Sequence, residues 1–170
     1  MGQHINNNGG RASSAAAIAE RAYAAIASAF PVCAFSDEFY FFPQVVQEGK
    51  AWQPWDDFSD QGISDIADIL LGHERALSKL FRDDVFDDEQ VDVELLTQVL
   101  RAMREQLVEV GSHRSQPTFH LTVLAAGLAE ALASSDPGAW PARVAGVPAF
   151  LKRAADCLDE VPQLFLALGF

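Results

Sequence analysis

Apolar residues recur every three or four positions along most of this chain, which is the spacing of one face of an α-helix. The pattern stops at Pro31 and at Gly111 and restarts at Pro117, as helix ends and starts commonly do. Pro148 lies inside the last stripe and predicts a second helix start there. Together the stripes predict helices over residues 12–29, 60–81, 89–110, 117–133 and 140–161.

No stretch needs a β-strand to explain its pattern. We therefore expect an all-α fold, a compact bundle of five or six helices arranged as antiparallel hairpins. Ser13 or Ser14 is placed to cap the first helix and Asp60 the second, and residues 112–117 read as a loop.

Residues 30–58 interrupt the helical pattern and hold nine of the seventeen aromatic residues. They follow neither a helical nor a strand period, which indicates irregular backbone with large apolar anchors. Each such ring buries about 150 to 250 Å², so the segment should lie across the helices. Ser36, Asp37 and Glu38, followed by Tyr40, form a polar patch among the rings. That patch is a candidate ligand-binding wall, or a set of turn residues between anchored rings.

The predicted helix 119–133 can carry charge only at His120 and Glu130, so it is apolar nearly all round. Such a helix is central or lies at an interface. The C-terminal run 164–170 is apolar as well. We therefore expect a protein or peptide partner, with a homodimer through helix 119–133 or the C-terminus as one form of it.

Composition narrows the class of protein. A chain of 170 residues suits one helical domain, expected over 12–170, behind a disordered tail over 1–11. The net charge of −12 disfavours binding to nucleic acids or to anionic membranes. The alanine-rich stretch 12–29 is broken by Glu20 and Arg21, so we expect neither a signal peptide nor a membrane span. Cys33 and Cys157 are expected to be free thiols of a cytoplasmic protein.

The stretch from His113 to His120 is the densest polar cluster in an apolar setting. His113, Arg114 and His120 could bind a carboxylate, since arginine forks onto carboxylates and a helix start favours anions. Alternatively, Arg114 caps a helix or pairs with an acid, and His120 is a core histidine that has found its hydrogen bond.

Metal binding is weighed at two places. His73 lies on the predicted buried stripe of 60–81, and a pair of His73 with His120, helped by Asp37, Glu38 or Glu74, could hold one zinc or manganese ion. The alternative is that both histidines pack in the core, and our leading expectation is no cofactor. Two Asp-Asp-x-x-Asp stretches, 56–60 and 83–87, could bind Mg²⁺ or could serve as helix caps and dipole partners.

Several pieces occur in an order shared with one known family. They are Phe30-Pro31, the run 55–59 followed by Gly62-Ile63, the run 91–96, the loop before Phe119-His120-Leu121, and the run 143–151. In this order the chain resembles the N-terminal helical region of a bacterial family of metallopeptidase-like proteins, distantly akin to the Taq-type carboxypeptidases. The resemblance covers most of residues 30–162 and implies a wall of a substrate channel. In that family the zinc motif His-Glu-x-x-His lies much further along the chain, in a region that this sequence does not have.

The only partial match to that motif in this sequence starts at His73 and has Leu77 where the second histidine would be. We therefore assign no catalytic residue. The sequence therefore predicts a non-catalytic helical binding domain, with a groove lined by the aromatic segment. Two alternatives stay open. One is a part of a split or truncated zinc peptidase, and the other is a small metal-dependent enzyme using His73, His120 and nearby acids.

Overall fold

The computed structural model describes residues 14–44, 51–81, 88–159 and 161–163. Within these ranges the ordered elements are helical and no strand occurs, which confirms the all-α prediction. The expected tail 1–11, the second aspartate stretch 83–87 and the apolar run 164–170 lie outside the described residues. The helices are α1 Ala15–Ala29, α2 Asp60–Ser78, α3 Asp88–Glu105, α4 Ser112–Ser115, α5 Pro117–Ala133 and α6 Ala139–Cys157.

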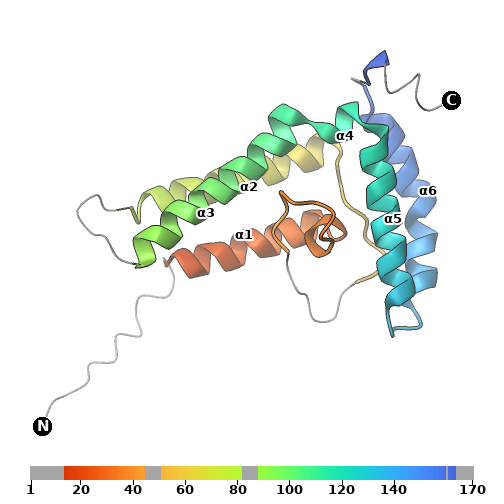
Figure 1. Ribbon diagram of the computed structural model, residues 1–170, viewed down its shortest axis with the longest axis horizontal. Helices are drawn as coiled ribbons and strands as arrows, with labels where there is room; N and C mark the ends of the chain where they lie inside the picture. The colour runs from red at the N-terminus through yellow and green to blue at the C-terminus, as the bar shows by residue number, and fades with distance from the viewer. Residues whose placement is uncertain (1–13, 45–50, 82–87, 160, 164–170) are drawn as a thin grey trace, which may run out of the picture.

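Helices α1, α2 and α3 lie side by side, with α2 and α3 as an antiparallel hairpin (Figure 1). Their predicted stripes form the shared core, whose fully buried members include Ile26, Leu70, Leu77, Leu100 and Met103. One position differs from the prediction. The stripe of α2 buries Glu74, whereas His73 beside it is only half-buried.

Helices α5 and α6 form a second antiparallel hairpin, which stands across one end of the first three helices (Figure 1). A π-helical turn, Gln106–Val110, extends α3 as far as Gly111, whose φ of 56° is left-handed and suits glycine. The chain then forms the short helix α4, where the sequence suggested a loop.

Two predicted helix boundaries were wrong. The N-cap of α2 is Ser59, whose side chain accepts the Gly62 N–H, rather than Asp60. Helix α6 runs through Pro148 without a second start. Proline removes one backbone donor, so the carbonyl of Val144 loses its partner. Val144 is on the exposed side of the helix.

Residues 30–44 and 51–58, which we call the aromatic strap, run between the three-helix layer and the α5–α6 hairpin. The strap has little regular structure beyond a 3₁₀ turn at Cys33–Phe35, as its sequence predicted. Its rings fill the space between the two groups of helices: Phe30 stacks on Phe58, and Phe39 and Phe58 both meet Phe119 of α5 edge-on.

In the part of the chain that the structure describes, no helix combines the length and the apolar character needed to cross a bilayer.

Candidate functional site

A buried carboxylate fixes the course of the aromatic strap. Asp56 is 1% exposed, and its two oxygens accept the backbone N–H groups of Val32 and Cys33 at 2.6 and 3.0 Å. The first half of the strap is thereby tied to the second half. Asp56 belongs to the first aspartate stretch, 56–60, for which the sequence suggested Mg²⁺ binding or helix capping. In the structure this residue caps a turn of the strap instead.

Burial raises the pKa of Asp56 from 3.8 to about 6, because removal from water disfavours the ionised form. The hydrogen bonds from Cys33 and Val32 and the charge of Arg143 act in the opposite direction. Burial likewise raises the pKa of the Cys33 thiol. Cys157 is also a free thiol, and its S–H donates to the carbonyl of Phe58. Neither cysteine is activated as a nucleophile.

The strap is held to α6 by Arg143, a fully buried arginine. Its guanidinium donates to the Pro54 carbonyl, lies 4.9 Å from the ring centre of Trp55 and approaches Glu130 of α5 at 3.9 Å. The indole N–H of Trp55 in turn donates to the Arg143 carbonyl at 3.1 Å. Arg143 therefore joins the strap, α5 and α6 at one point.

A hollow of about 270 Å³ lies where the sequence suggested a binding wall. Ser36, Asp37 and Glu38 line it from the strap, and Ala126, Ala129 and Glu130 line it from α5. Tyr40 does not line the hollow: its side chain is 87% exposed, and its ring meets that of Phe41 edge-on. The hollow thus has an apolar base and three carboxylates.

The cluster from His113 to His120 does not form an open anion site. Arg114 forks onto Asp159, with contacts of 3.0 and 2.5 Å. His113 is buried and stacks on Phe58. His120 donates its Nε2–H to the His113 carbonyl at 2.7 Å, and its Nδ1 is buried without a hydrogen-bond partner. Burial lowers the pKa of His120 and lowers the pKa of His113 to about 4, so both rings are neutral at pH 7.

The metal pair of His73 and His120, which the sequence left open as an alternative to core packing, is not brought together. His113, which bonds His120, lies close enough to Asp60 for that carboxylate to influence its pKa. His73 follows Asp60 by thirteen residues on the same helix, which is about 20 Å along the axis. His73 therefore lies far from the end of α2 near which His113 and His120 lie. Glu74 points instead to Arg104 and Arg101, at 2.9 and 3.6 Å. Among the described residues, no three His, Cys, Asp or Glu side chains gather in a way that could hold a metal ion.

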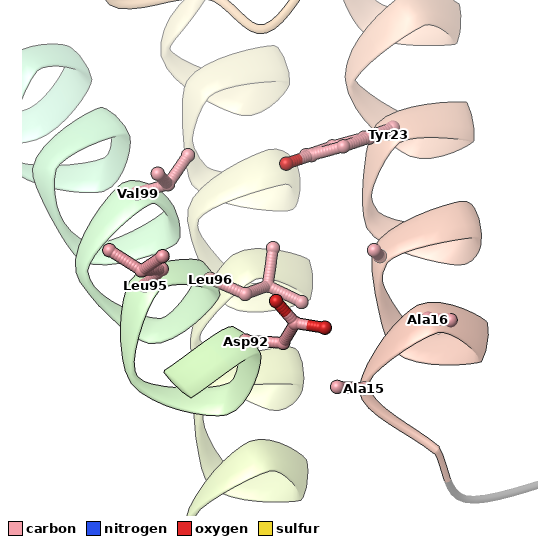
Figure 2. A pocket seen from close by; sticks show the side chains of 8 residues that line it. Ala15, Ala16, Tyr23, Asp92, Leu95, Leu96 and Val99 are labelled. Carbon is pink, nitrogen blue, oxygen red and sulfur yellow. The ribbon is translucent and has the colours of Figure 1, made fainter. Parts of the chain in front are cut away.

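A second hollow, of about 240 Å³, lies between α1 and α3, and we call it the α1–α3 groove. Figure 2 shows Tyr23 reaching from α1 with its hydroxyl toward α3, while the carboxylate of Asp92 points back toward α1. The other lining residues are apolar: Ala15, Ala16, Ala19, Leu95, Leu96 and Val99. The alanines of α1 leave the space that larger side chains would fill.

The groove continues onto an exposed apolar stripe of α3. Val91, Leu95 and Val99 follow each other at intervals of four residues and are 41%, 55% and 41% exposed. They lie on a different face of α3 from its buried stripe. Helix α3 therefore has two apolar faces, of which only one is covered by α1 and α2.

Among the residues that the structure describes, the charges beside the α1–α3 groove are acidic. Asp92 lines it, and the exposed Asp88 and Glu20 lie about one helical turn from the lining residues Asp92 and Ala16. The basic residues of these helices face elsewhere: Arg101 and Arg104 meet Glu74, and Arg21 acts on His73. The α1–α3 groove is thus an apolar floor with an acidic rim.

Comparison with known proteins finds no matching family model, no matching curated protein and no matching solved structure. The metallopeptidase-like resemblance of the sequence stays a prediction.

Proposed function

We propose that this protein is a helical binding domain whose ligand is a basic amphipathic helix, seated in the α1–α3 groove. The observation that carries the proposal is the exposed stripe of Val91, Leu95 and Val99 beside an apolar hollow. Amphipathic helices bind such grooves by placing an apolar ridge on the floor. The hollow can take the side chains of that ridge, and the stripe extends the contact along α3.

The acidic rim supports a ligand with positive charge. Lysines or arginines flanking the apolar ridge would meet Asp88, Asp92 and Glu20, whereas an acidic helix would be repelled. The net charge of −12 acts in the same direction at longer range, because it attracts a basic ligand and speeds encounter.

The hollow beside Ser36, Asp37 and Glu38 is the place that the sequence suggested for a ligand. It is also rimmed by carboxylates, but among the described residues it has no exposed apolar stripe beside it comparable with that of α3. We therefore place the ligand at the α1–α3 groove. A role in substrate binding is also what the metallopeptidase-like resemblance implies.

Peptide titration tests the proposal. Two fluorescent amphipathic peptides would carry the same leucine face and either a lysine or a glutamate face. We expect the lysine peptide to bind and the glutamate peptide not to bind. Leu95→Lys should weaken binding of the lysine peptide about tenfold or more, since it removes apolar contact and adds repulsion.

The matched control is Leu132→Lys, which places the same charge on an exposed leucine of α5. It should leave the affinity within about twofold of the wild type, because substitutions away from a site have small effects. Equal affinity for both peptides, or equal loss in both variants, would exclude this groove as the binding site.

A further inference from the structure

A large apolar face lies on the outer side of the α5–α6 hairpin, away from the aromatic strap. Its exposed members are 40% to 71% accessible: Leu121, Leu132, Trp140, Val144 and Leu151. Half-buried Leu128 and Val147 lie between them, at the seam of the two helices. Contiguous exposed apolar faces on a folded chain commonly mark an interface.

The spacing of the face is that of a helix bundle. On α5 the apolar positions are Leu121, Ala125, Leu128 and Leu132, and on α6 they are Trp140, Val144, Val147 and Leu151. Both series have intervals of four, three and four residues, which is the repeat of helices that pack along a common seam. Since α5 and α6 are antiparallel neighbours, helical geometry puts both series on the same side of the hairpin (Figure 1).

None of the residues that make up this face is ionisable. The charged groups of α5 and α6 are elsewhere: Glu130 and Arg143 meet each other on the strap side, Arg153 lines a hollow with Trp55 of the strap, and Lys152 pairs with Asp156. A chain of net charge −12 resists contact with its own copy over most of its surface. A charge-free apolar face is where two such chains can meet without placing carboxylates together.

We propose that two copies of the chain associate through this face, with hairpin against hairpin around a two-fold axis. A two-fold contact uses the same patch on both copies, so an apolar patch without charge is complementary to itself. The product is an antiparallel bundle of four helices, α5 and α6 from each copy. The proposal is independent of the α1–α3 groove.

Sedimentation velocity on the purified full chain tests the inference, over about 1 to 100 µM, where micromolar association is visible. The wild type should sediment as a dimer at the upper end of this range. Leu132→Glu and Val144→Glu should each weaken dimerisation about tenfold or more, since each replaces a buried apolar contact by a carboxylate. Both positions are exposed in one copy, so the variants should keep their helical circular dichroism.

The matched control is Leu95→Glu, an equally apolar and exposed position on α3. It should dimerise like the wild type. A wild type that stays monomeric at 100 µM would overturn the inference and leave the face to a different protein. A dimer that persists in Leu132→Glu and Val144→Glu but dissociates in Leu95→Glu would place the contact on α3 and overturn it equally.

Discussion

Asp56 and Arg143 are buried charged residues that each hold together segments lying far apart in the chain. Asp56 ties the two halves of the aromatic strap through the N–H groups of Val32 and Cys33. Arg143 ties the strap to α6 through the Pro54 carbonyl. Because a buried charge is costly unless its partners are in place, the course of the strap depends on both side chains.

The pKa of Asp56 gives a pH test. Its folded value of about 6 exceeds the unfolded value of 3.8, so protonation favours the folded state. The stability from this group is complete below about pH 4 and is lost as the pH rises through 6. A pKa difference of this size corresponds to about 3 kcal/mol. The folded pKa of His113 is lowered to about 4, so that residue acts oppositely and loses stability as the pH falls from 6.5 to 4.

In the wild type these two effects oppose each other between pH 4 and 6. Asp56→Asn removes the first effect and leaves the second. We therefore expect the free energy of unfolding of Asp56→Asn, from urea titrations, to fall more steeply on acidification than that of the wild type. Parallel pH profiles for the two proteins would show that the carboxyl group does not gain a proton in this range.

Neither of these two roles was assigned from the sequence. Asp56 stood in a stretch that suggested either Mg²⁺ or a helix cap, and it caps the strap turn instead. Arg143 lies on the buried stripe of α6. A charged residue in such a stripe indicates that a buried hydrogen-bonding or charged partner lies nearby. That partner, the Pro54 carbonyl, is 89 positions earlier and so could not be located by spacing.

At the scale of elements, the five long helices and their buried stripes could be predicted because an amphipathic period is local information. The break at residues 30–58 was also predictable, from its missing period and its aromatic content. Its packing was not, since it depends on which helices leave room for Trp55. Gly127 of α5 and Gly146 of α6 provide that room from opposite sides of the indole.

These glycines yield a test of the strap. A Cβ at Gly127 would lie 2.8 Å from the Trp55 ring, and one at Gly146 would lie 2.6 Å from it. Gly127→Ala and Gly146→Ala should each destabilise the protein by about 1 to 3 kcal/mol, the usual cost of overpacking.

Gly72→Ala is the control for these variants, because a Cβ there meets nothing within 4 Å. In an α-helix this change should stabilise by up to about 1 kcal/mol. Denaturant midpoints of the three variants measure the difference. Stabilisation by all three substitutions would contradict the packing of Trp55 between α5 and α6.

At the scale of the whole molecule, the sequence predicted the fold class but not its division into a three-helix layer and a hairpin. Helix 119–133 was expected to be central or at an interface because it is apolar nearly all round. In the structure the described residues cover only one side of α5, and Leu121 and Leu132 are exposed to solvent. The sequence also could not show whether His73 and His120 meet. His73 belongs to the three-helix layer and His120 to the α5–α6 hairpin, and spacing along the chain does not reveal that separation.

Because the chain is acidic, salt should affect binding at the two proposed surfaces in opposite directions. Salt screens the attraction between the acidic groove and a basic peptide, so peptide affinity should fall between about 0.05 and 0.5 M NaCl. Salt also screens the repulsion between two copies of charge −12, so dimerisation should strengthen over the same range. Fluorescence anisotropy and sedimentation velocity measure the two responses. Trends of the same sign would show that both readouts report one surface.

The most direct test of the binding domain is an NMR titration of the ¹⁵N-labelled chain with the lysine-faced peptide. Binding in the α1–α3 groove predicts that amide shifts change most at Tyr23, Asp92, Leu95 and Val99. Shift changes confined to Ser36–Glu38 and Ala126–Glu130 would move the ligand to the strap hollow and contradict the proposed site. An unchanged spectrum at saturating peptide would contradict the proposed function itself.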